Sequence, residues 1–216
     1  MNNLAIILFF KFIKMSEEGD EDYTTIKVIL LGETTVGKTS LINIYFGKKF
    51  QDNIISTSMP ESERKILEIN KNKYLIEMMD TAGQERYRSM NNLFIKGSKV
   101  VIFVYDITKE KTFNELNYWV KTAKGILNTD AVYGIAENKA DLINDIKVSD
   151  GVGKKYAKEN DAMFCTTSAK EDSKGFQIFV DQLVKQYIEK NIDKSSNEKN
   201  GKKISIENTK KKSKCC

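Results

Sequence analysis

The chain contains no histidine, and its 216 residues include only three cysteines, three arginines and one proline. Without histidine it cannot form a Ser-His-Asp triad, an imidazole general base or a histidine-ligated metal site. Three cysteines are too few for a disulfide scaffold or a four-cysteine zinc site. Only Cys165 lies inside the body of the chain, which suits a reducing compartment. One proline and 12 glycines exclude a collagen-like or proline-rich chain.

What remains has the composition of a soluble chain with a full core: 40% hydrophobic, 30% charged and 10% aromatic residues. The length suits one domain of ordinary size with tails. The net charge of +5 is uneven, because residues 194–214 hold eight lysines against two glutamates. The rest of the chain carries a net charge of −1. A nearly neutral body argues against a nucleic-acid groove, so we expect no nucleic-acid partner.

The two ends of the chain differ from the body. We predict that residues 191–216 are a disordered basic tail, because they are poor in apolar residues. The tail ends in Cys215 and Cys216, two thiols that lipid-attaching enzymes can reach, although the C-a-a-X pattern is not met. Residues 1–22 are a predicted extension whose apolar stretch is too short to span a bilayer. We expect translation to start at Met15, which would leave residues 1–14 out of the native protein.

Between the tails, apolar runs of strand length alternate with segments of helical period. Buried-strand runs are predicted at 26–31, 100–105, 131–136 and 163–166, a hairpin at 65–69 and 74–79, and helices at 38–46, 113–127 and 176–188. Strands and helices in this order predict an α/β fold with a mostly parallel sheet and helices on both faces. Ligands of such folds bind beyond the carboxyl ends of the strands.

The first strand runs into GETTVGKT, which matches the phosphate-loop pattern G-x-x-x-x-G-K-[ST] between a strand and a helix. Gly37 lets the backbone curl so that successive N–H groups face a phosphate. Lys38 supplies a charge for the β- and γ-phosphates, and the Thr39 hydroxyl can bind Mg²⁺. The residues predicted to bind nucleotide here are Gly32, Thr34, Thr35, Val36, Gly37, Lys38, Thr39 and Ser40.

A second motif, DTAGQE, begins with Asp80 at the end of the next buried strand. This carboxylate lies at the same predicted sheet edge as the phosphate loop, where it can hold Mg²⁺, through water. The N–H of Gly83 can approach a γ-phosphate, and Gln84 can orient an attacking water. Asp80 is therefore a predicted metal residue, and Lys38 and Gln84 are the predicted catalytic pair.

Two further motifs follow later strands. In NKAD, the Asp141 carboxylate can accept both N–H donors on the edge of guanine, a pair that adenine lacks. Asn138 can bridge loops, and the stem of Lys139 can lie along the base. In SAK, which comprises Ser168, Ala169 and Lys170, the N–H of Ala169 can reach guanine O6. Their order and position predict a guanine site.

Together, GETTVGKT, DTAGQE, NKAD and SAK resemble the motif set of a Ras-superfamily small GTPase over about residues 24–188. The Rab branch matches best, because of YRSM after DTAGQER, VYDIT at the end of the strand at 100–105, and the Cys-Cys end. The resemblance implies a P-loop NTPase fold whose six-stranded, mostly parallel sheet has one antiparallel edge strand, in a small GTPase domain over 23–190. It implies a Mg²⁺-dependent GTPase, slow without an activating partner, that switches between GTP and GDP in vesicle trafficking.

The resemblance assigns further residues and partners. Thr57, 19 residues after Lys38, matches the switch threonine that meets Mg²⁺ and the γ-phosphate, and Phe50 matches the aromatic residue against guanine. Cys215 and Cys216 match a doubly geranylgeranylated end that anchors the protein to the cytoplasmic face of an endomembrane, from which it cycles with the cytosol. The implied partners are an exchange factor, a GTPase-activating protein, a dissociation inhibitor and effectors.

Some residues depart from the family pattern. Thr34 and Thr35 place two β-branched side chains in the phosphate loop, where they can crowd the attacking water. Pro60 and its neighbours replace the usual Rab effector-reading segment, and Met79 replaces a tryptophan. These departures indicate a divergent Rab. They leave open an alternative, a hydrolysis-poor GTP-binding platform for effectors. A third hypothesis is a kinase-like enzyme that acts on ATP, and the NKAD and SAK motifs argue against it.

Overall fold

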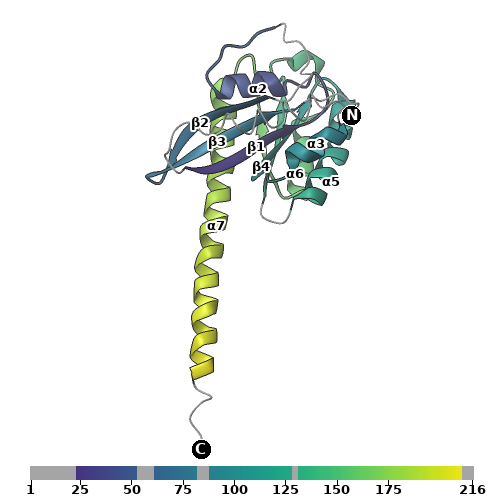
Figure 1. The fold of residues 1–216 in the computed structure, drawn as a ribbon. Coiled ribbons are helices and arrows are strands. Elements are labelled where there is room, and N and C mark those ends of the chain that lie inside the picture. Colours follow the sequence, from purple (N-terminus) through teal and green to yellow (C-terminus); the bar gives the residue numbers. More distant parts are fainter. Residues whose placement is uncertain (1–22, 53–60, 82–87, 128–130, 211–216) are drawn as a thin grey trace, which may run out of the picture.

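The computed structural model describes residues 23–52, 61–81, 88–127 and 131–210, with the backbone alone at 61, 88–91 and 173 and from 193 onward. Strands and helices alternate along these residues (Figure 1). The strands are β1 Thr24–Leu31, β2 Glu61–Ile69, β3 Asn72–Asp80, β4 Val100–Asp106, β5 Val132–Asn138 and β6 Ala162–Thr166. The helices are α2 Lys38–Tyr45, α3 Arg88–Ile95, α4 Glu110–Asn114, α5 Leu116–Ile126, the 3₁₀ turn η2 Ile143–Asp145, α6 Asp150–Glu159 and α7 Ser173–Lys210.

The strands form one six-stranded sheet in the order β2-β3-β1-β4-β5-β6. All neighbours are parallel except β2, which pairs antiparallel with β3 at one edge. The predicted fold class is therefore confirmed. The β2–β3 turn is tighter than predicted, since only Asn70 and Lys71 separate the strands, at φ 52° and 66°. Two consecutive positive φ angles are typical of the type I′ hairpin turn, whose twist matches that of the strands.

Helices cover both faces of the sheet because successive strand residues point to opposite sides. Alternate residues of β1 and β4 pack with α2 and α7 on one face, where Leu41 and Phe176 are fully buried. The other residues of these strands pack with α3, α5 and α6, where Trp119 is fully buried. Every residue of β4 is buried, as expected for the central strand of a sheet covered on both sides.

Three helical segments differ from the sequence prediction. The predicted helix at 113–127 begins earlier and is divided at Glu115 into α4 and α5. Helices α3 and α6 were not predicted. In α6 only Gly153 and Ala157 are buried, so its buried stripe is too narrow to give a helical period of large apolar residues.

Helix α7 begins at the sheet and extends past it, and its second half projects away from the body (Figure 1). Its backbone is helical to Lys210, whereas composition predicted disorder from residue 191. Residues 191–210 contain no proline and include five lysines, a residue with good helix propensity. The predicted domain boundaries stay a prediction. Among the helices of the described residues, none combines the length and hydrophobicity needed to cross a membrane.

Candidate nucleotide-binding site

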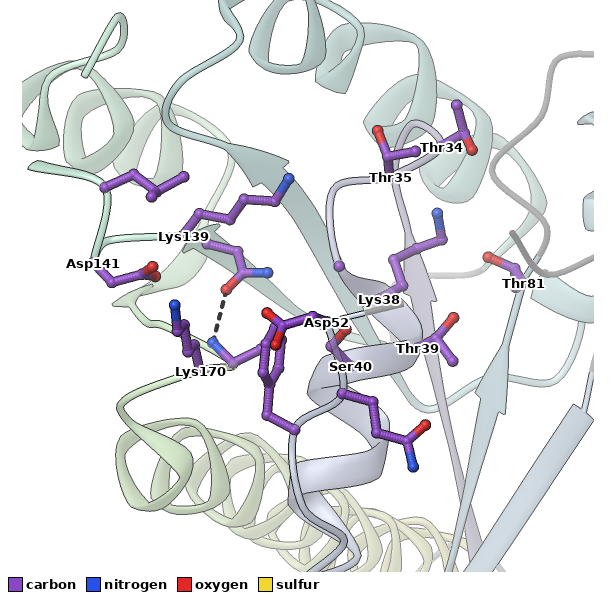
Figure 2. A pocket seen from close by; sticks show the side chains of 16 residues that line it. Thr34, Thr35, Lys38, Thr39, Ser40, Asp52, Thr81, Lys139, Asp141 and Lys170 are labelled. Atoms are coloured by element: carbon purple, nitrogen blue, oxygen red, sulfur yellow. Dashed lines mark hydrogen bonds between the residues drawn. The ribbon is translucent and has the colours of Figure 1, made fainter. Parts of the chain in front are cut away.

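A cavity of about 450 Å³ opens where the strands end at their carboxyl edge (Figure 2). The phosphate loop borders it on one side and the loops after β5 and β6 on the other. The predicted nucleotide-binding residues that line it are Thr34, Thr35, Gly37, Lys38, Thr39, Ser40, Phe50, Asn138, Lys139, Asp141, Ala169 and Lys170. The described residues of the four motifs therefore meet at one edge of the sheet, as their positions after strands predicted.

Other predicted residues lie beside the cavity or beyond the described chain. Gly32, Val36, Asp80 and Ser168 contact residues of the lining without belonging to it. The predicted residues Thr57, Gly83, Gln84, Cys215 and Cys216 lie outside the described residues. Their assignments stay predictions.

The structure adds four lining residues to those predicted: Gln51, Asp52, Thr81 and Leu142. Each directly follows a predicted site residue or its neighbour in the chain, and adjacency is the only sequence signal that marks them. Thr81 also has a structural role, because its hydroxyl donates a 2.7 Å hydrogen bond to the carbonyl of Leu30. This bond joins the ends of β3 and β1 beneath the cavity.

The turn of the phosphate loop depends on Gly37. Its φ of 99° lies in the left-handed region, which favours glycine. A Cβ at this position would also collide with the side-chain amide of Asn138. The same residue precedes α2 directly, so the N-terminus of that helix faces the cavity. This places backbone N–H groups and the positive end of the helix dipole where an anion can bind.

Lys38 is the buried cation of the site, with 5% of its surface exposed. Its Nζ donates hydrogen bonds of 3.0 and 2.8 Å to the carbonyls of Gly32 and Glu33. Burial lowers the pKa of Lys38 to about 8, and the charges of Asp80 and Glu33 partly oppose this effect. An anion bound beside this amine would stabilise its charged form.

Thr39 and Asp80 form the candidate metal position. The Thr39 hydroxyl donates a 2.8 Å hydrogen bond to Asp80 Oδ2, which joins the first turn of α2 to the end of β3. Asp80 is 6% exposed. A hydroxyl and a carboxylate at this spacing are oxygen ligands of the kind that Mg²⁺ prefers, so the donor set fits the predicted metal.

The other end of the cavity contains Asp141. Ser168 donates a 2.6 Å hydrogen bond to Asp141 Oδ1, and the hydroxyl of Ser168 accepts bonds from the N–H groups of Lys170 and Glu171. Two chain segments 27 residues apart are thereby joined. The carboxylate of Asp141 is oriented by the serine and still has acceptor capacity for a ligand at the cavity.

Lys139 lies next to Asp141 and is held by a different carboxylate. Its Nζ is 2.6 Å from Oδ2 of Asp106, which is 1% exposed at the end of β4. Although burial raises the pKa of Asp106, hydrogen bonds from Lys139 and Thr108 outweigh it and hold this pKa below its ordinary value. The ion pair fixes the ammonium end of Lys139, and its aliphatic stem contributes to the cavity wall.

Asn138 connects the two ends of the cavity. Its Nδ2 donates a 2.8 Å hydrogen bond to the carbonyl of Val36 in the phosphate loop. Its Oδ1 accepts a 3.2 Å bond from the N–H of Ala169, drawn as the dashed line in Figure 2. Asn138 is 1% exposed. The predicted bridging of loops by this residue is thus present in the described contacts.

Thr35 adopts an uncommon backbone conformation. Its φ of 62° lies in the left-handed region, which is costly for a β-branched residue. Lys109, from the loop after β4, places Nζ 3.5 Å from Thr35 Oγ1. The departure from the family pattern at this position therefore coincides with local backbone strain at the phosphate end of the cavity.

Comparison with known proteins agrees with this geometry. The Ras family model matches residues 27–190. The Ras-related protein SEC4 of Saccharomyces cerevisiae is 32% identical over 182 residues, which cover 83% of this chain and 84% of that protein. Rab-21 of Geodia cydonium is 37% identical over 165 residues, 76% of this chain and 72% of that protein. Human Rab-22A is 37% identical over 156 residues, 72% of this chain and 80% of that protein.

The chain therefore belongs to the Ras family and is a small GTPase. Its similarity to Rab-named relatives at 32–37% identity makes it a divergent member of the Rab branch.

Proposed function

We propose that this chain is a GTP/GDP switch whose cavity holds the phosphates over α2 and the guanine between the loops after β5 and β6. The chain is a Rab-like small GTPase that hydrolyses GTP and acts in vesicle trafficking. The observation that supports the proposed pose is the single cavity that Lys38 and Asp141 line from opposite ends (Figure 2).

At the phosphate end, Lys38 and the N–H groups of the loop offset the charge that develops on the phosphates during transfer. Thr39 and Asp80 would hold Mg²⁺, and Thr57 would join them in the GTP state. This ion, when bound, neutralises charge on the β- and γ-phosphate oxygens. Gln84 aligns the attacking water, since the chain has no histidine to act as a base.

At the base end, Asp141 accepts hydrogen bonds from the N1–H and N2–H groups of guanine, and the N–H of Ala169 donates one to guanine O6. Lys139 and Phe50 contribute the faces against which the base lies; both line the cavity. Adenine would leave the acceptor capacity of Asp141 unmatched, and such mismatches carry most of the discrimination between similar ligands.

The family membership favours a hydrolysing switch over the hydrolysis-poor platform. Regulators and effectors are partners of the family in general. For this chain we propose an exchange factor, an activating protein, a dissociation inhibitor and effectors.

We further propose double geranylgeranylation at Cys215 and Cys216, because two lipid chains with a basic segment give stable anchoring where one chain is marginal. The protein acts on endomembranes, and we propose their cytoplasmic face, with cycling through the cytosol.

The decisive experiment measures nucleotide binding and hydrolysis together. Purified protein with Mg²⁺ should bind GDP and GTP far more tightly than ADP and ATP in calorimetry. Single-turnover GTP hydrolysis should be slow alone and accelerate by about 10³–10⁵ when a cell extract supplies an activating partner. Gln84→Leu should abolish the acceleration and leave GTP affinity unchanged. An equal stimulated rate in this variant would contradict the role of Gln84, and equal affinity for ADP would contradict the function.

A further inference from the structure

Glu137 is a buried acidic residue immediately before Asn138, and none of the four motifs includes it. It occupies the penultimate position of β5, and 3% of its surface is exposed. A carboxylate at such a position is costly unless hydrogen bonds compensate its lost hydration. Two hydroxyl groups do so at 2.7 Å each: Tyr105 Oη donates to Oε2 and Thr166 Oγ1 to Oε1.

The three residues belong to three adjacent strands. Tyr105 lies in β4, Glu137 in β5 and Thr166 in β6, each within the last two residues of its strand. Glu137 is paired across the sheet with both partners, which are its direct neighbours in the strand register. One carboxylate thus joins the ends of the three strands whose following loops form the base end of the cavity.

Helix α6 leaves room for this arrangement. A Cβ on Gly153 would collide with the hydroxyl of Tyr105 and lie 2.8 Å from the ring of Phe164. Glycine at this buried helical position therefore lets Tyr105 reach Glu137. Burial, followed by the bond to Glu137, raises the pKa of Tyr105, so its hydroxyl stays protonated and donates.

Each partner of Glu137 directly precedes residues of the site. After Tyr105 comes Asp106, which pairs with Lys139. After Thr166 comes Thr167, whose N–H donates to the carbonyl of Glu137 at 2.9 Å and whose carbonyl accepts from Ala140 at 3.1 Å. Ser168, next in the chain, donates to Asp141. A displacement of Thr166 would therefore be transmitted through two residues to the guanine-recognising carboxylate.

We propose that Glu137 is a positioning residue for guanine recognition: its bonds to Tyr105 and Thr166 hold the loops after β4, β5 and β6 in the register that aims Asp141 and Ala169 at the base. This assignment rests on the proposed function. Glu137 itself does not line the cavity, so it acts through these neighbours.

The test compares GDP with inosine diphosphate, which lacks only the N2 amino group of guanine. The dissociation constant of inosine diphosphate divided by that of GDP reports how well Asp141 is oriented toward the N2 amino group. A large ratio means a well-oriented carboxylate. Thr166→Val removes one donor at an exposed rim position with little change of volume, and Glu137→Met removes both acceptors. We expect each to reduce the ratio and to speed GDP dissociation by about tenfold, the order expected for a lost hydrogen bond to a charged group. Glu137→Gln keeps one acceptor oxygen and replaces the other with an NH₂ donor, from which a hydroxyl can accept, so this variant should keep most of the wild-type ratio and dissociation rate.

Two matched variants lose a hydroxyl far from the base. Ser98→Ala removes the bond to the carbonyl of Phe94, and Tyr156→Phe removes the bond to Asn117. Both should keep the wild-type ratio even where they lower the melting temperature. If Glu137 only stabilises the fold, Thr166→Val and Glu137→Met will lower the melting temperature and leave the ratio unchanged. That result would overturn the assignment of Glu137. The proposed function would still stand if the wild type selects GDP over ADP. A wild type without that selectivity would overturn both.

Discussion

The two ends of the cavity are built in different ways. The phosphate end comes mainly from one continuous segment, in which Lys38 bonds carbonyls only five and six residues away. The base end is assembled from three loops by side-chain bonds over longer separations, such as the 27 residues between Asp141 and Ser168. The geometry of the phosphate end therefore follows largely from one local motif, whereas the base recognition that we propose would depend on the register of neighbouring strands.

Breaking the phosphate end should have the largest effect. Lys38→Met removes the buried cation, and GDP and GTP should each bind about 1,000-fold more weakly, as expected for two lost charge-assisted bonds to phosphate. Calorimetry with both nucleotides measures this. Lys27→Met is the control, because Lys27 is half-buried and its ammonium bonds the carbonyl of Lys96 instead of facing the cavity. A Lys38→Met chain with wild-type affinity would refute the phosphate role.

Breaking the base end should change selectivity instead. Asp141→Ala loses two acceptors for guanine, so GDP should bind about 100-fold more weakly, while the affinity for ADP stays the same. The ratio of the two constants separates this variant from Lys38→Met, which should weaken both nucleotides. The exposed Asp145 offers a control in Asp145→Ala. An equal loss for ADP and GDP in Asp141→Ala would contradict the division of the cavity into two ends.

A smaller effect should reveal the strain in the phosphate loop. Glycine ordinarily destabilises a fold relative to alanine, but at the φ of 62° of Thr35 the order should reverse. We expect the free energy of unfolding of Thr35→Gly to exceed that of Thr35→Ala by about 1 kcal/mol. Urea denaturation of the nucleotide-free proteins measures this difference. Greater stability of the alanine variant would show that Thr35 is not strained.

The smallest effect concerns a thiol outside both ends. Burial, with smaller contributions from Asp172 and Glu137, raises the pKa of Cys165 to about 12. Since the thiolate is the reactive form, and a raised pKa keeps the thiol protonated below that value, Cys165 should resist iodoacetamide at pH 8 in the folded protein. It should react after denaturation in urea. Mass spectrometry of the tryptic peptides distinguishes the two states, and rapid alkylation of the native chain would contradict the shift.

This contrast between the two ends also explains what the sequence could predict. The phosphate loop, Asp80 at the end of β3 and the positions of NKAD and SAK after strands follow from motifs and apolar runs. Helix α6 could not be found in this way, because its buried positions are a glycine and an alanine. The links between Glu137, Tyr105 and Thr166 were equally invisible, since they depend on strand register, which no local pattern specifies.

The side chain of Asn138 has a consequence for nucleotide release. One amide group simultaneously fastens the carbonyl of Val36 and orients the N–H of Ala169. In the proposed pose, a regulator that moved the phosphate loop would therefore also move the side chain that orients the Ala169 N–H toward the base. A displacement of the phosphate loop alone would then weaken the contacts to both the phosphates and the base. Release of the nucleotide would need only one such displacement.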